Sequence, residues 1–320
     1  MTTKSGRILI GLLMLGMLLP ALTQAAGFPN KPITLIVPYP AGGATDVVIR
    51  PLAEAAKKHL GQPVIVENRG GGGGAVGVGS IIGKNPDGYL LSVVVTSLHR
   101  ASFINKLSFD TVRDVTPIIR VAGYLYGILV NQNSPHKTLK DLLEYAKTHP
   151  GKVSYMASGI GTGGHIAMEE LGYFAGGLKF NHLPSKGDQE SSTALLGGHI
   201  EAISTTSGWI PLTDAGKFRL LATYGEKRTK RYPNVPTVYE LGYKFVHNSP
   251  IGIVGPKGMP KDVVKILHDA FKKALEDPIF LETMNKFEMP VMYQNSEDFT
   301  KYWAEAYGEA GEHVKKYIKK

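Results

Sequence analysis

Two glycine loops carry the groups best suited to hold a small anion. The first contains Gly42 and Gly43 and leads into a helical pattern at 46–60, and the second runs over 158–164 and leads into another at 165–174. A helix start leaves backbone N–H groups without intrahelical acceptors and carries a partial positive charge. Glycine lets an anion approach those N–H groups at little steric cost. The two loops therefore predict two helix starts that bind a negatively charged group.

Polar residues at the ends of predicted strands could line the same site. Ligands of parallel α/β sheets collect at the carboxyl ends of the strands, where these residues would meet. The hydroxyl residues could equally be turn and cap residues, so both interpretations stay open. The candidate ligand-binding residues are Tyr39, Ala41, Gly42, Gly43, Ala44, Thr45, Asp46, Thr96, Ser97, His99, Ser158, Gly159, Gly161, Thr162, Gly163, Gly164, His165, Thr205 and Thr206.

Three of these candidates have a competing structural role. Asp46 either stabilises the helix start, as a cap or as a first-turn acid, or faces the cleft, and we favour the capping role because Asp is a leading cap residue. His99 and His165 stand at favourable positions, but each is either ligand-facing or an ordinary structural histidine.

Signals for catalysis, cofactors and metals are weak or missing. The pattern G-x-G-x-x-G occurs at 72–77 and 159–164, but chance hits are expected among 38 glycines. Neither hit is followed at the right distance by the acidic residue that a dinucleotide site needs. The chain has no phosphate loop, no H-E-x-x-H, no G-x-S-x-G and no cysteine, which removes thiol nucleophiles and thiolate metal sites. We predict no catalytic residue, no cofactor and no metal.

The elements that must position the loops repeat along the chain. An apolar strand precedes the first loop and another, at 152–157, precedes the second. Alternating strands and helices predict an α/β fold with mainly parallel sheets flanked by helices. The apolar stretches 115–130 and 249–256 could carry the chain to a second lobe and back. We therefore predict a first lobe from 26–124 and 248–320, an inserted second lobe from 125–247, and a hinge between them.

The first residues and the charge predict the compartment and the partners. Lys4 and Arg7 precede an uncharged apolar run at 8–22 that is too short to span a membrane. With the small residues that follow, this predicts a signal peptide at 1–25, cleaved near Ala25. The net charge of +9 favours acidic solutes. The basic clusters at 227–231 and 315–320 largely lack interleaved aromatic residues, which argues against a nucleic-acid partner.

In their order and spacing, these motifs resemble the exported substrate-binding proteins of tripartite tricarboxylate transporters, the Bug receptors of proteobacteria. The resemblance covers nearly all of the chain after the signal peptide and rests on the segments 36–46, 66–69, 86–89, 96–99, 157–165, 194–198, 215–219 and 233–237.

The resemblance implies a two-lobed, type II periplasmic binding protein that closes on a small carboxylate and delivers it to membrane permease subunits. It implies a periplasmic monomer without catalysis of its own. In that family, backbone amides and hydroxyls of two loops hold one ligand carboxylate, and these loops correspond here to 41–45 and 159–164.

Two departures from the family pattern bear on the ligand. The segment 183–187 lacks the aromatic residue common there, and Ser204, Thr205 and Thr206 stand where many members place an Asp. Hydroxyls in place of that carboxylate would remove a partner for a ligand ammonium group. We therefore expect a mono-, di- or aromatic carboxylate rather than an amino acid.

Two other functions are compatible with the sequence. The closed lobes could contact a membrane signalling kinase instead of a permease, since both roles use the same closure. A secreted enzyme on the same fold is the third possibility, although the sequence offers no credible pair of nucleophile and base.

Overall fold

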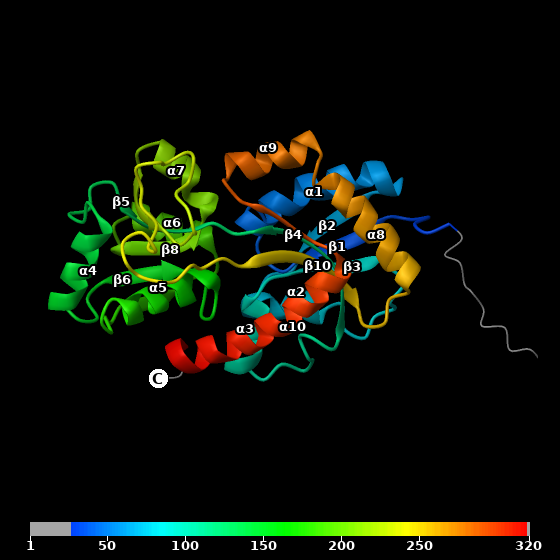
Figure 1. Cartoon of the computed structure of the whole chain (residues 1–320), viewed down its shortest axis with the longest axis horizontal. Helices are drawn as coiled ribbons and strands as arrows, with labels where there is room; N and C mark the ends of the chain where they lie inside the picture. Colours follow the sequence, from blue (N-terminus) through cyan, green and yellow to red (C-terminus); the bar gives the residue numbers. More distant parts are fainter. Residues whose placement is uncertain (1–26, 319–320) are drawn as a thin grey trace, which may run out of the picture.

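The computed structural model describes residues 27–318, which form two α/β lobes lying side by side (Figure 1). The predicted signal peptide at 1–25 lies outside the described residues. Within 27–318, no helix is both long enough and apolar enough to cross a membrane.

The sheet of the first lobe has six strands in the order β11-β4-β10-β3-β1-β2. The central strand β1 pairs in parallel with β2 and β3, whereas β10 runs antiparallel to β3 and β4, and β11 runs antiparallel to β4. The strands are β1 (Ile33–Val37), β2 (Val64–Asn68), β3 (Leu90–Val94), β4 (Val115–Gly123), β10 (Pro250–Pro256) and β11 (Val291–Gln294).

Helices cover both faces of this sheet, which explains why its strands are apolar on both sides. Leu35 of β1 packs in the larger core under α1 and α8, whereas its neighbour Ile36 packs on the opposite face with Phe299 and Trp303 of α10. The helices of this lobe are α1 (Ala44–Leu60), η1 (Gly72–Gly74), α2 (Ala75–Gly79), α3 (Ser97–Ile104), α8 (Lys261–Ala274), α9 (Pro278–Lys286), α10 (Ser296–His313) and the π-helical turn Val314–Ile318.

The sheet of the second lobe has five strands in the order β7-β6-β8-β5-β9. Strand β6 is parallel to β7 and β8, and β5 is antiparallel to β8 and β9. The elements are β5 (Tyr126–Asn131), α4 (Leu139–Thr148), β6 (Ser154–Ala157), α5 (Gly163–Phe174), β7 (Asn181–Pro184), α6 (Asp188–Leu196), β8 (Ala202–Thr206), η2 (Ser207–Trp209), α7 (Ile210–Asp214) and β9 (Phe218–Thr223).

The α/β fold class predicted from the sequence is confirmed, but strand direction differs from the expected mainly parallel arrangement. Both sheets are mixed, because β10 and β5, the strands that begin where the chain crosses between lobes, run antiparallel to their neighbours. The stretch 115–130 is two strands in two different sheets, interrupted at Tyr124 and Leu125. The lobe boundaries at 124/125 and 247/248 stay a prediction.

Candidate ligand-binding site

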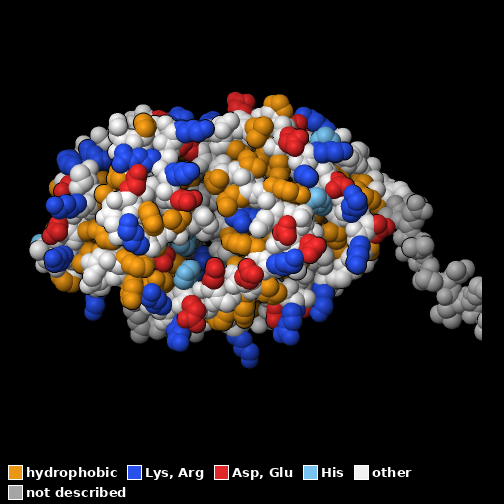
Figure 2. Space-filling model, viewed as in Figure 1, with side chains coloured by type: hydrophobic (Ala, Val, Ile, Leu, Met, Phe, Trp, Pro, Cys, Tyr) orange, Lys and Arg blue, Asp and Glu red, His pale blue; other side chains and the backbone are white. Residues whose placement is uncertain are grey.

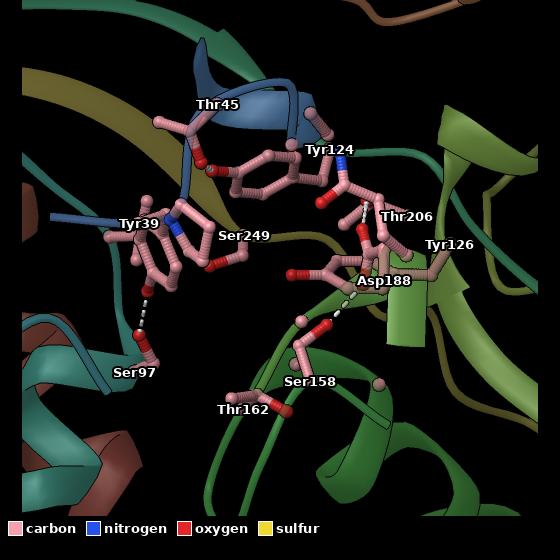
Figure 3. Close-up of a pocket in the computed structure, with 18 residues that line it drawn as sticks. Tyr39, Thr45, Ser97, Tyr124, Tyr126, Ser158, Thr162, Asp188, Thr206 and Ser249 are labelled. Atoms are coloured by element: carbon pink, nitrogen blue, oxygen red, sulfur yellow. Dashed lines mark hydrogen bonds between the residues drawn. The ribbon is translucent and has the colours of Figure 1, made fainter. Parts of the chain in front are cut away.

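A cavity of about 60 Å³ lies where the two lobes meet, and both glycine loops border it (Figure 3). The first lobe supplies the β1–α1 loop and Ser97, the second supplies the β6–α5 loop and the start of α6, and Tyr124, Tyr126 and Ser249 come from the crossing segments. Its lining residues are Tyr39, Pro40, Gly43, Ala44, Thr45, Val95, Ser97, Tyr124, Tyr126, Ser158, Thr162, Gly163, Gly164, Gly187, Asp188, Gln189, Thr206 and Ser249.

The first glycine loop presents the start of α1 to the cavity. The first bond along α1 runs from the Val47 amide to the Gly43 carbonyl, so the preceding amides of the first turn have no acceptor within the helix. Gly43 is the N-cap and offers no side chain of its own to those amides. They are therefore available to a ligand anion.

Asp46 is an acid in the first turn of α1, but it neither caps the helix with its side chain nor lines the cavity; its carboxylate instead holds the first loop. Its carboxylate accepts hydrogen bonds from the Gly42 amide at 2.9 Å, Arg50 Nε at 2.9 Å and Asn68 Nδ2 at 2.8 Å. Burial raises the pKa of Asp46, but these hydrogen bonds outweigh burial and leave the pKa below its ordinary value. The ionised carboxylate therefore fixes the shape of the first loop.

The second glycine loop presents the start of α5 in the same way. The Ile166 amide donates to the Thr162 carbonyl, so the amides before it have no acceptor within the helix. A Cβ on Gly163 would lie 2.2 Å from the Tyr126 hydroxyl oxygen, and one on Gly164 would lie 2.0 Å from the Ser204 carbonyl oxygen. Glycine is required at both positions because this loop packs directly against β5 and β8.

Three tyrosines complete the wall of the cavity: Tyr124 and Tyr126 are buried and Tyr39 is half-buried. The Tyr39 hydroxyl lies 2.6 Å from Ser97 Oγ, and the Tyr124 hydroxyl lies 2.5 Å from Thr45 Oγ1. Burial raises the pKa of Tyr39 to about 12 and raises the pKa values of Tyr124 and Tyr126 well above the ordinary value. All three phenols therefore keep their protons at neutral pH and can donate hydrogen bonds.

Asp188, in the first turn of α6, is the acidic residue of the cavity. Ser158 and Thr205 donate hydrogen bonds to its Oδ1, and Thr206 donates to its Oδ2 at 2.5 Å. The hydroxyls at 204–206 therefore do not leave the cavity without a carboxylate. The hydroxyls of β8 hold a carboxylate that α6 supplies.

Sequence comparison decides the family. Residues 48–318 match the TctC family, described as the tripartite tricarboxylate transporter family receptor. The chain belongs to this receptor family. It is 45% identical over 287 residues to the UPF0065 protein in the gbd 5′ region of Cupriavidus necator, covering 90% of this chain and 88% of that protein. It is 31% identical to the protein BugT of Bordetella pertussis over 81% of each chain.

Solved structures agree with this membership. The periplasmic binding protein BugD superposes with a TM-score of 0.84 at 30% identity, covering 90% of this chain and 98% of that one. A structure described as a periplasmic transporter gives a TM-score of 0.85 at 33% identity with the same coverage. The resemblance predicted from the motifs is confirmed, and with it a receptor that is not an enzyme.

Within this receptor fold, the cavity brings together just over half of the residues predicted from the sequence. Those on the cavity are Tyr39, Gly43, Ala44, Thr45, Ser97, Ser158, Thr162, Gly163, Gly164 and Thr206. Ala41 and Gly159 line a neighbouring cavity at the mouth of the two loops. Thr205 reaches the site through Asp188, and Thr96 through a 2.6 Å hydrogen bond between its Oγ1 and Ser249 Oγ.

Two further predicted residues, Gly161 and Gly42, lie outside the cavity, where the two lobes approach each other. The Gly161 carbonyl accepts a hydrogen bond from Arg100 Nε of α3 at 2.5 Å, which joins the two lobes. Gly42 lies beside Gln189 at the entrance, where a Cβ would approach the Gln189 side-chain nitrogen to 2.9 Å.

His99 and His165 both take the structural role. His99 is fully buried, and its ring nitrogens lie 2.7 Å from Thr111 Oγ1 and 2.9 Å from the Trp303 carbonyl oxygen. His165 Nδ1 accepts from the Gly161 amide at 3.0 Å, and its ring stacks on His182. Burial lowers the pKa of each to about 3, so both are neutral at physiological pH. Neither ring lines the cavity.

Sequence reasoning missed the residues that reach the cavity from the crossing segments and from α6. Tyr124 and Tyr126 lie between Gly123 and Gly127, and this change from aliphatic to aromatic residues could have marked the crossing. The pair Asp188 and Gln189 follows Gly187 at a helix start, which is the signal used for the other two loops. Within residues 27–318, no group of three or more His, Cys, Asp or Glu side chains could hold a metal.

Proposed function

We propose that this protein captures a small carboxylate in the cavity between its lobes and delivers it to the permease subunits of a tripartite tricarboxylate-type transporter. The observation that carries the proposal is that two helix starts, one from each lobe, border one small cavity. Each start contributes amides without intrahelical acceptors, so a carboxylate between them is bound by both lobes.

The groups around the cavity are suited to hold and release such an anion. The amides of the α1 and α5 starts and the phenols of Tyr39, Tyr124 and Tyr126 are neutral donors. Hydrogen bonds to an ionised oxygen are stronger than neutral ones, and the exclusion of water strengthens them further. Because no lysine or arginine of the described chain lines the cavity, binding depends on closure of the lobes around the ligand.

Family membership supports the transport role, and ligands of other proteins with this fold support the ligand class. Structures of two Rhodopseudomonas palustris proteins, each 24% identical to this chain, carry malate and adipate. We propose a periplasmic location after removal of residues 1–25, and a monomeric receptor, because the two lobes of one chain already enclose the ligand.

Calorimetric titration of the mature chain tests the proposed function. The panel contains mono-, di-, tri- and aromatic carboxylates, amino acids, and neutral amides of the same size as controls. We expect saturable binding by at least one carboxylate and none by its amide, because the amide lacks the negative charge that the helix starts attract. A folded protein that binds no acid in the panel would contradict the proposal.

A further inference from the structure

We propose that Asp188 makes this receptor select a small carboxylate that also carries a protonated amino group. The ligand is then a zwitterion of the amino-acid type rather than a plain mono- or dicarboxylate, which reverses the preference predicted from the hydroxyls at 204–206. The inference rests on the proposed carboxylate-binding function.

The charge balance of the cavity is the first observation. Among the described residues that line the cavity, Asp188 has the one charged side chain. No Lys, Arg or His of residues 27–318 lines the cavity with it. Arg100 is buried and acts electrostatically on Tyr39 and Tyr126 of the lining, but it does not line the cavity itself, and its Nε donates to the Gly161 carbonyl. A ligand with two carboxylates would therefore bring one of them toward an acidic side chain with no cation in the lining to pair with it.

The way Asp188 is held is the second observation. Its Oδ1 accepts from both Ser158 and Thr205, while its Oδ2 accepts from Thr206. A carboxylate oxygen has about two acceptor positions, so these bonds leave Oδ2 able to accept one more. In Figure 3 Asp188 lies between Ser158, Thr206 and Tyr126 at the second-lobe side of the cavity. Asp188 thus keeps a free acceptor position on a side chain that lines the cavity.

The position of Asp188 in its helix is the third observation. It lies in the first turn of α6, directly after the N-cap Gly187, where the helix start favours a negative side chain. The hydroxyls of Ser158, Thr205 and Thr206 donate to its two oxygens and fix the side chain in place. The carboxylate is therefore a stable part of the closed site, not a group displaced by the ligand.

These observations divide the cavity into two chemical halves. The α1 and α5 starts and the tyrosine phenols donate hydrogen bonds, which suits the ligand carboxylate. Asp188 accepts, which suits an ammonium group with its three N–H donors. Selection follows from the difference, because Asp188 attracts the amino group of one ligand and repels the second carboxylate of another.

Matched ligand pairs that differ in a single amino group test this assignment. Alanine is compared with propionate, and glutamate with glutarate, by calorimetry on the mature chain. We expect the amino-bearing member of at least one pair to bind at least about tenfold more tightly than its partner. Wild-type protein that binds glutarate or propionate as tightly as the amino-bearing partner would overturn the inference.

The variant Asp188→Asn keeps the size and the acceptor oxygen but removes the charge. We expect it to reduce the preference for the amino-bearing ligand by about tenfold or more and to leave the affinity for the plain acid equal or higher. Glu190→Gln is the matched control, since Glu190 lies in the same helix and its Oε2 accepts from the Lys186 amide, outside the cavity. The control should keep the wild-type preference.

The outcomes separate this inference from the proposed function. Binding of plain carboxylates with no effect of Asp188→Asn would reject the role of Asp188 and leave the receptor function standing. A folded wild-type protein that binds no member of either pair or of the larger panel would reject both. Thermal unfolding of each variant confirms that the compared proteins are folded.

Discussion

At the scale of single residues, Gly163 shows how the second loop and the tyrosine wall depend on each other. A Cβ at this position would lie 2.2 Å from the Tyr126 hydroxyl oxygen and 2.4 Å from Tyr126 Cζ. We expect Gly163→Ala to displace the Tyr126 ring from the cavity and to lower ligand affinity at least about tenfold, measured by calorimetry.

Gly208→Ala is the control for that substitution, because a Cβ on Gly208 meets no heavy atom within 4 Å. It should bind ligand as the wild type does. Wild-type affinity of Gly163→Ala would show that Tyr126 does not contact the ligand.

The buried histidines predict a pH dependence of stability. His99 has a pKa of about 3 in the folded protein because of burial, below the value of about 6.5 of an unfolded chain. Its neutral form therefore stabilises the fold fully above about pH 6.5, and this contribution is lost as the pH falls toward about 3. At about pH 5 the loss is on the order of 2 kcal/mol for one such histidine.

Urea unfolding at about pH 7.5 and about pH 5 measures this loss. His99→Gln can still accept from Thr111 and donate to the Trp303 carbonyl, so it should fold and lose less stability between the two pH values than the wild type. An equal loss in both proteins would exclude His99 as a source of the dependence.

At the scale of elements, the start of α1 has its shape because Asp46 connects it to β2. Its carboxylate accepts from the Gly42 amide in the loop and from Asn68 at the end of β2. Asp46→Ala leaves these donors without their charged acceptor, and each such hydrogen bond is worth about 1.5–3 kcal/mol. We expect ligand affinity to fall about tenfold, since the amides at the helix start lose their fixed direction.

Glu54→Ala is the matched control in the same helix, because Glu54 is exposed and pairs only with Lys57 among the described contacts. Calorimetry on both variants separates a loop effect from a general effect on α1. Equal affinities of the two variants would contradict the bracing role of Asp46.

At the scale of the whole molecule, a few hydrogen bonds join the two lobes. Arg100 of α3 donates to the Gly161 carbonyl, and Tyr317 near the C-terminus donates to Glu170 of α5 at 3.3 Å. On the face drawn in Figure 2, Lys and Arg side chains are interspersed with Asp and Glu. On this face, therefore, the positive side chains do not form a single patch.

The contact between Arg100 and Gly161 is expected to slow the release of the bound ligand. Since it forms only when the lobes meet, Arg100→Ala should raise the ligand dissociation rate about tenfold and change the association rate by less than about twofold. Stopped-flow fluorescence measures both rates. Arg113→Ala is the control, because Arg113 is exposed and pairs with Asp110 in the same lobe. An unchanged dissociation rate in Arg100→Ala would contradict the role of this contact in closure.

The sequence by itself determined the features that contiguous residues encode. The periods of α1, α5 and α8, the two glycine loops before helix starts, and the order of the family motifs all lie in short segments, so they were predictable. Just over half of the binding residues predicted from the sequence line the cavity. Local patterns were sufficient there because helix starts and strand ends depend on neighbours in the chain.

Only the tertiary structure decided strand direction, the roles of the buried side chains and the charge of the cavity. Asp46, His99 and His165 have partners from distant elements, so their roles could not be read from local spacing. Asp188 is the clearest case. Its sequence position on α6 gives no sign that it meets Thr205 and Thr206, because that contact exists only once α6 packs against the end of β8.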